Sequence, residues 1–89
     1  MITTYKEEYG PSQYNNTGEQ LRIGWASWDD NTFQYRSIKY VYLDTSGKIS
    51  RGCPELPFDI LVDMVIAANQ QGELSEGDIE KIKKAFTDK

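Results

Sequence analysis

The hydrophobic pattern of this sequence changes once along the chain, from the alternation of a β-strand to the spacing of an amphipathic helix. Up to residue 52 the apolar residues alternate or gather in aromatic and β-branched runs, and from residue 57 onward they recur at helical spacing. Strands followed by helices indicate an α+β fold. We therefore predict a small antiparallel sheet of three to four strands in a β-meander, followed by two C-terminal helices packed on one face.

The length of 89 residues leaves room for one hydrophobic core. The sequence therefore predicts a single domain over 1–89. Within it, residues 1–19 form a loose N-terminal arm or an edge strand, residues 20–52 the antiparallel sheet, and residues 57–87 the two helices. The pattern leaves open which face of the sheet the helices cover.

Two strands stand out in the first half of the chain. Alternation predicts the first over residues 20–28, and the density of aromatic and β-branched residues predicts the second over 33–43. In the second segment the apolar positions change from odd to even, which a bulge near Arg36 would reconcile. Residues 38–52 resemble a β-hairpin, and the Gly-Cys-Pro sequence at 52–54 should end the sheet.

The first predicted helix begins near Pro57 and ends near Gly72, a residue suited to a left-handed cap. It is apolar almost all round, because a second stripe of Ile60, Met64 and Ala67 accompanies the first stripe. The first stripe consists of Phe58, Leu61, Val62, Val65 and Ala68. Such a helix is normally buried on several sides. A second helix is predicted over 76–87, opened by a capping box of Ser75 and Asp78.

Composition excludes several classes of protein. With one cysteine and no histidine, an intrachain disulfide and the usual zinc sites are absent, and no motif predicts a cofactor, a metal or a catalytic residue. No leader and no membrane-spanning run is recognisable, so we expect a cytoplasmic protein. The net charge of −4, with no Lys or Arg between residues 55 and 80, disfavours nucleic acid.

Three sets of residues could carry chemistry, and each has a simpler structural explanation. Cys53 precedes a helix start, where the dipole favours a thiolate, yet it has no histidine to act as a base, and Gly-Cys-Pro more often marks a turn with a small buried thiol. Asp29 and Asp30 could join Asp44 in a carboxylate site, although adjacent acids at a strand end usually form turns. Asp59 and Asp63 share a helix face, which we expect to be a solvated strip.

Aromatic residues are the most distinctive feature of the sheet region. Tyr35, Tyr40 and Tyr42 are interleaved with Arg36 and Lys39, a pattern that fits stacking on a flat ligand or the stabilisation of a sheet by aromatic pairs. The negative net charge favours the second interpretation. In a regular strand over 20–28, Trp25 and Trp28 would point to opposite faces, so one of them would need a partner surface.

Three hypotheses about function follow. The leading one is a non-enzymatic interaction module that self-associates as a homodimer or higher homo-oligomer and binds other proteins, because burial in a second copy would add stability to a small core. The second is a small-molecule-binding protein with an aromatic pocket between sheet and helix for an apolar or aromatic ligand. The third is an enzyme based on Cys53 or on the Asp29, Asp30 and Asp44 set. The predicted ligand-binding or interface residues are Trp25, Trp28, Tyr40, Tyr42, Phe58, Ile60 and Met64.

Overall fold

The chain forms two compact units, Met1–Phe58 and Asp59–Lys89. The computed structural model describes residues 1–9, 18–29, 32–43, 46–49 and 53–88. An antiparallel sheet occupies the first unit, and two C-terminal helices follow it, so the predicted α+β fold is confirmed. The packing of both helices on one sheet face, like the single-domain organisation, concerns the arrangement of the two units and stays a prediction.

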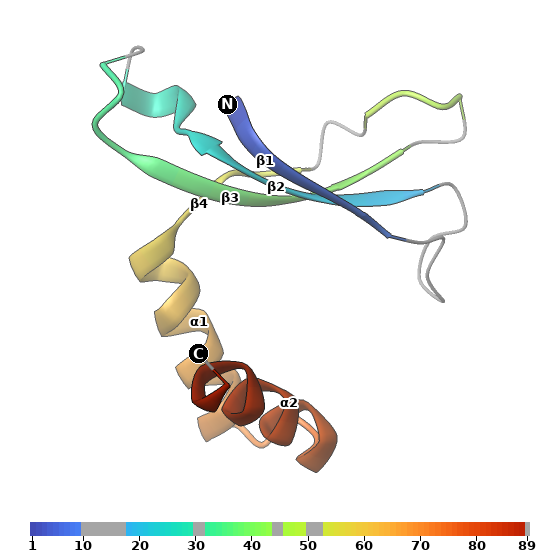
Figure 1. Ribbon diagram of the computed structural model, residues 1–89, viewed down its shortest axis with the longest axis vertical. Helices are drawn as coiled ribbons and strands as arrows, with labels where there is room; N and C mark the ends of the chain where they lie inside the picture. Colours follow the sequence, from blue (N-terminus) through green and yellow to red (C-terminus); the bar gives the residue numbers. More distant parts are fainter. Residues whose placement is uncertain (10–17, 30–31, 44–45, 50–52, 89) are drawn as a thin grey trace. The chain divides into compact units, whose positions relative to one another are not determined.

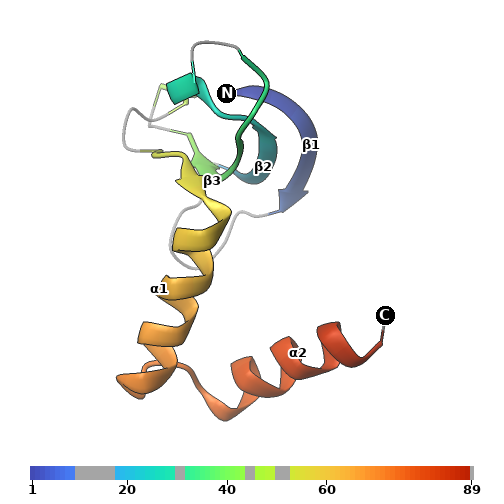
Figure 2. The same ribbon diagram turned by 90° about the vertical axis from the view of Figure 1, so that its left-hand side faces the viewer.

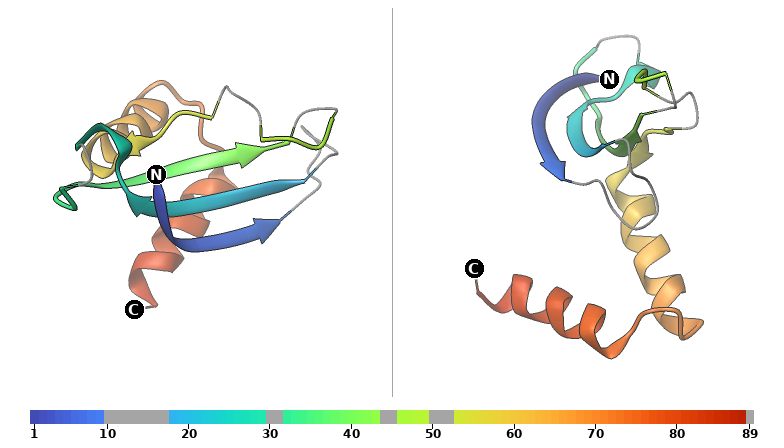
Figure 3. Two further views of the ribbon diagram at one scale, coloured as in Figure 1. Left: turned by 90° about the horizontal axis from the view of Figure 1, so that it is seen from above. Right: turned by 90° about the vertical axis from the view of Figure 1, so that its right-hand side faces the viewer.

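The sheet has four strands in the order β1-β2-β3-β4, with every neighbouring pair antiparallel. This is the meander expected from the sequence, and the three long strands lie side by side in Figures 1 and 3. The strands are β1 (Ile2–Tyr9), β2 (Glu19–Trp25), β3 (Arg36–Tyr42) and β4 (Leu56–Pro57).

The two faces of the sheet differ in chemistry. One face carries Leu21, Ile23 and Trp25 of β2, and the register places Tyr40, Ile38 and Arg36 of β3 opposite them. The other face carries Gln20, Arg22 and Gly24, opposite Val41, Lys39 and Ser37. Among the described residues the only buried apolar side chains are Ala26 and Val41. The first unit therefore has a very small core of its own.

Strand β1 pairs with β2 along its whole length, with one irregularity between Thr3 and Tyr5. Gly24 lies opposite Thr3 at this place, and a Cβ on Gly24 would stand 2.2 Å from the carbonyl oxygen of Ile2. Glycine is therefore required here because the two backbones approach closely.

The predicted strand over 20–28 is too long. β2 ends at Trp25, and Trp28 lies in a short 3-10 helix, η1 (Ser27–Asp29). The carboxylate of Asp29 accepts hydrogen bonds from the backbone N–H groups of Gln34 and Tyr35, at 3.2 and 3.1 Å. This contact closes the loop between β2 and β3. The expected placement of the two tryptophans on opposite faces of one strand is therefore wrong.

The predicted strand over 33–43 starts too early, and the bulge near Arg36 is not present. β3 begins at Arg36, and its pairing with β2 runs without interruption from Trp25↔Arg36 onward. Phe33 has a φ of 58°, in the left-handed region that a strand does not use. The change from odd to even apolar positions therefore marks the end of a loop rather than a bulge.

The sheet does not end at residues 52–54. Leu56 and Pro57 form β4 and pair with Ile38 and Ser37 of β3. In the predicted hairpin over 38–52 the structure contains an isolated bridge between Leu43 and Ile49, and residues 44–45 and 50–52 lie outside the described part. A two-residue strand that ends in proline carries almost no local signal, and proline is tolerated there because the strand is at the edge of the sheet.

The second unit contains most of α1 (Phe58–Gln70) and all of α2 (Glu76–Thr87). Gly72, with a φ of 72°, ends α1, because its N–H bonds to the carbonyl of Asn69 while the N–H of Glu73 bonds to that of Ala68. The capping box at the start of α2 is present, with Ser75 Oγ 3.0 Å from the N–H of Asp78. Neither helix is both long and apolar enough to cross a membrane.

Candidate functional site

Trp25 belongs to an aromatic and cationic group at one end of the sheet. The Arg36 guanidinium lies over its ring, 4.5 Å from the centroid, and Phe33 meets it edge-on at 5.8 Å. The Arg36 guanidinium also donates a hydrogen bond to the hydroxyl of Thr4 on β1. Trp25 thus has its contacts inside the first unit, and Phe33, which is 51% exposed, forms the outer part of this group.

Tyr40 and Tyr42 lie on the same face of β3, with ring centroids 5.6 Å apart. The register puts Trp25 opposite Arg36 and Tyr40 opposite Leu21. Arg36 and Tyr40 are four residues apart, so roughly 13 Å of strand separates the two aromatic groups. They are therefore two clusters rather than one site. The predicted pocket between sheet and helix depends on the arrangement of the two units and stays a prediction.

Trp28 and Tyr35 belong to the segments that enter and leave the loop between β2 and β3, and both are exposed. The Asp29 carboxylate accepts hydrogen bonds from this loop. Its role is the turn-forming one considered for the acidic pair. Asp30 and Asp44 lie outside the described residues. Within the described ranges, no group of three or more Cys, Asp or Glu residues could hold a metal ion.

The predicted interface residues of α1 are exposed. Ile60 is 43% exposed, Met64 is 50% exposed, and Phe58 at the start of the helix is 36% exposed. The first stripe is also largely uncovered, because Val62 and Val65 are exposed and only Leu61 and Ala68 are half-buried. Neither helix contains a buried residue among those described.

The two helices diverge from the turn after α1 at an open angle, as Figure 2 shows. A groove of about 300 Å³ lies between them, with α1 residues on one wall and the half-buried Ile79 and Ile82 of α2 on the other. The α1 wall and the turn contribute Val65, Ile66, Asn69, Gln70 and Leu74. Phe86, which follows Ile79 and Ile82 at helical spacing on α2, is 69% exposed instead. The second helix therefore covers only a small part of the first.

Glu55 was not found from the sequence, although it connects distant parts of the first unit. Its carboxylate accepts hydrogen bonds from the hydroxyls of Ser27 and Ser37, the latter at 2.9 Å, and the amino group of Met1 lies 3.6 Å away. Partial burial raises the pKa of this carboxyl, but the serine hydrogen bonds and the Met1 charge outweigh that effect and hold its pKa below the usual value. The contacts are 18 and 28 residues distant in sequence, so no local pattern signals them.

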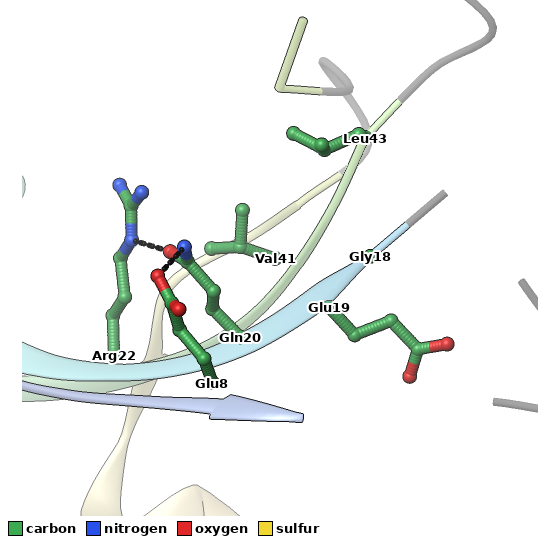
Figure 4. A pocket seen from close by; sticks show the side chains of 7 residues that line it. All are labelled: Glu8, Gly18, Glu19, Gln20, Arg22, Val41 and Leu43. Atoms are coloured by element: carbon green, nitrogen blue, oxygen red, sulfur yellow. Dashed lines mark hydrogen bonds between the residues drawn. The ribbon is translucent and has the colours of Figure 1, made fainter. Parts of the chain in front are cut away.

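A second feature missed from the sequence is a cavity on the polar face of the sheet. It has a volume of about 340 Å³ and is lined by residues of β1, β2 and β3 and their ends (Figure 4). Arg22 and Gln20 of β2 stand on one side of it, and Val41 and Leu43 on the other. The remaining lining residues are Glu8, Gly18 and Glu19.

Comparison with known proteins adds no functional assignment. No family model, no curated protein and no solved structure matches this chain. We therefore base the function on the surfaces of the molecule.

Proposed function

We propose that this protein is a non-enzymatic interaction module that self-associates through its helical unit. The observation that carries the proposal is the exposure of α1, on which Val62, Met64 and Ile66 are each about half exposed. A helix with apolar side chains on several sides is normally covered on several sides. In this chain α2 covers only a small part of α1, so another surface would have to bury the remaining apolar side chains.

The helices are too short to depend on their own backbone hydrogen bonds. α1 has 13 residues and α2 has 12, and isolated helices shorter than about 12–15 residues are marginal in water. Helices of this length gain most of their stability from packing of an apolar face. Because α2 diverges from α1, a partner that fills the angle between them would stabilise both (Figure 2).

Charge favours a second copy of the same chain as this partner. The first turns of α1 carry Asp59 and Asp63, and α1 has no Lys or Arg. The middle of α2 carries Lys81, Lys83 and Lys84. In a two-fold dimer the acidic start of one α1 would meet this basic middle part of the other α2, and the same contact would occur twice.

The exposed surface is also of a suitable size. A large side chain carries roughly 150–200 Å² when fully exposed, so half of that on six side chains of α1 leaves about 500 Å² in each protomer. A standard interface buries about 800 Å² per partner. The groove between the helices would supply much of the difference. The six side chains are Phe58, Ile60, Val62, Met64, Val65 and Ile66.

Size-exclusion chromatography with light scattering tests the proposal on the wild type, on Met64→Glu and on Gln71→Glu. Gln71→Glu is the matched control, because it adds the same charge at an exposed position just after α1. We expect a wild-type dimer or larger oligomer, an unchanged Gln71→Glu protein and a monomeric Met64→Glu protein, since a buried charge without a partner is costly.

Helix formation is coupled to association in this proposal, so helical circular dichroism of the wild type should increase with protein concentration together with the mass. This second measurement remains informative if Met64→Glu loses helix when it dissociates. A wild-type monomer at high micromolar concentration, with helix content independent of concentration, would overturn the proposal. The exposed surface of α1 would then belong to the sheet of the same chain or to a different protein.

A further inference from the structure

Three cationic side chains lie directly opposite one another across the polar face of the sheet. Lys6 of β1 pairs with Arg22 of β2, and Arg22 pairs with Lys39 of β3. Residues opposite each other in antiparallel strands have Cβ atoms about 4.5–5.5 Å apart, and like charges in such positions destabilise the sheet. A row of three like charges is therefore destabilising unless an anion lies nearby.

The described carboxylates of the first unit neutralise only one end of this row. Glu8 lies 3.6 Å from the ammonium of Lys6, and Glu55 on the same face is bound by Ser27 and Ser37. Within the part of the chain that the structure describes, no carboxylate is within 4.0 Å of the Arg22 or Lys39 nitrogens. The row thus keeps an excess of positive charge at Arg22 and Lys39.

Arg22 is held in a defined position at the cavity. Its Nε donates to Gln20 Oε1 at 2.9 Å, and Gln20 Nε2 donates to Glu8 Oε1 at 2.9 Å (Figure 4). Gln20 therefore fixes the guanidinium through its Nε. The two Nη groups remain as a pair of parallel donors, which matches the two oxygens of a carboxylate.

The other side of the cavity is apolar. Val41 of β3 and Leu43 just after it line this side, opposite the guanidinium of Arg22 (Figure 4). Val41 is buried in the sheet, so the half-buried Leu43 presents the apolar surface. Glu19, although it lines the same cavity, directs its carboxylate away from Arg22. The volume of about 340 Å³ is at the lower end of the range for small-ligand sites. One charged side and one apolar side fit a ligand with one charged end and a short apolar body.

From this arrangement we propose that the cavity binds a carboxylate that carries a short apolar group. The carboxylate oxygens accept hydrogen bonds from the two Nη groups of Arg22, Lys39 adds a second positive charge, and the apolar group contacts Leu43. A single negative charge fits better than a phosphate dianion, because the Glu8 carboxylate is bonded to the same Gln20 and would repel the larger charge. This site is separate from the helical surface proposed for self-association.

Isothermal titration calorimetry with hexanoate tests the proposal, with 1-hexanol and acetate as probes that lack the charge and the apolar chain. We expect saturable binding of hexanoate, and binding of both other probes weaker by at least about tenfold. Arg22→Gln should weaken hexanoate binding by at least about tenfold, because the variant loses a charge-assisted, bidentate contact. Lys48→Gln is the matched control, since it removes one positive charge from an exposed position of the sheet unit outside the cavity lining, and should bind as the wild type does.

Amide chemical shifts in a titration with hexanoate locate the binding site. We expect shifts at Gly18, Gln20 and Val41, whereas binding in the helical groove would shift Val65 and Ile66 instead. Shifts confined to the helical groove, no saturable binding, or equal affinity of wild type and Arg22→Gln would each overturn the proposal. A short peptide that ends in leucine, compared with its C-terminal amide, distinguishes a peptide terminus from a small organic acid as the source of the carboxylate.

Lys39→Gln provides a variant whose folding is not in question, because it removes repulsion between neighbouring strands. It should raise the midpoint of thermal unfolding by a few degrees and weaken hexanoate binding by about threefold. A variant that gains stability while it loses affinity would show that the charge row is kept for binding. Lower stability with unchanged affinity would contradict that role.

Discussion

Glu55→Gln should destabilise the sheet unit, and the size of the effect follows from the contacts of the carboxylate. Glu55 accepts hydrogen bonds from Ser27 on one side and from the fully buried Ser37 on the other. Glutamine keeps the shape and one acceptor oxygen, but its amide nitrogen cannot accept from a hydroxyl. Loss of one charge-assisted hydrogen bond costs about 1.5–3 kcal/mol. The midpoint of thermal unfolding should fall by roughly 6–24 °C.

The pH dependence of this effect has a definite sign. The pKa of Glu55 in the folded protein lies below its ordinary value of 4.5. The carboxylate therefore contributes stability that is fully present above pH 4.5 and is lost as the pH falls through the folded-state pKa. Glutamine does not titrate. The difference in stability between wild type and Glu55→Gln should be largest near neutral pH and should narrow below pH 4.5.

Urea unfolding followed by the fluorescence of Trp25 and Trp28 measures this difference, since both tryptophans belong to the sheet unit. The wild type and Glu55→Gln are compared at one protein concentration, at neutral pH and at about pH 3. Glu80→Gln is the control, because the Glu80 side chain is 75% exposed and its loss should change the stability by less than about 0.5 kcal/mol. Equal stability of wild type and Glu55→Gln at neutral pH, or a difference that does not narrow at low pH, would refute the reasoning.

Two glycine substitutions, with a third as a control, test the backbones of the two units. Gly24→Ala should lower the stability of the sheet unit by about 1–3 kcal/mol, because the new Cβ would meet the backbone of Ile2 and displace β1. Gly77→Ala in α2 is its control and should raise stability by up to about 1 kcal/mol; equal effects of the two substitutions in thermal unfolding would contradict the close approach of β1 and β2. Gly72→Ala should destabilise the helical unit by about 1–2 kcal/mol through its positive φ alone, since nothing lies within 4 Å of the new Cβ. Helical circular dichroism during unfolding measures this loss, and an unchanged midpoint would argue against the left-handed cap.

The ends of the helices could be predicted from the sequence because their signals are local. Ser75 and Asp78 are three residues apart and bond to each other's backbone, and Gly72 ends α1 through hydrogen bonds to the preceding turn. The apolar character of α1 was equally readable, and the structure leaves Ile60 and Met64 exposed. The α+β order follows from the change of period, which depends only on neighbouring residues.

The features that the sequence did not predict depend on residues that are far apart in the chain. β4 exists because Leu56 and Pro57 meet Ile38 and Ser37, and two residues carry no period of their own. The strand expected at Phe33 is a loop because tertiary contacts override the β-propensity of its aromatic residues.

Strand register, which the sequence did not predict, decides which candidate residues lie together. The sequence identified Trp25, Tyr40 and Tyr42 by their type, but the register of β2 and β3 divides them into two clusters. Register also brings Lys6, Arg22 and Lys39 into one row, although they are separated by long stretches of sequence. The amino-acid sequence by itself determined the two helices and their place after the sheet. The tertiary structure decided which charges meet, because a shift of one residue in strand pairing would move each side chain to the other face.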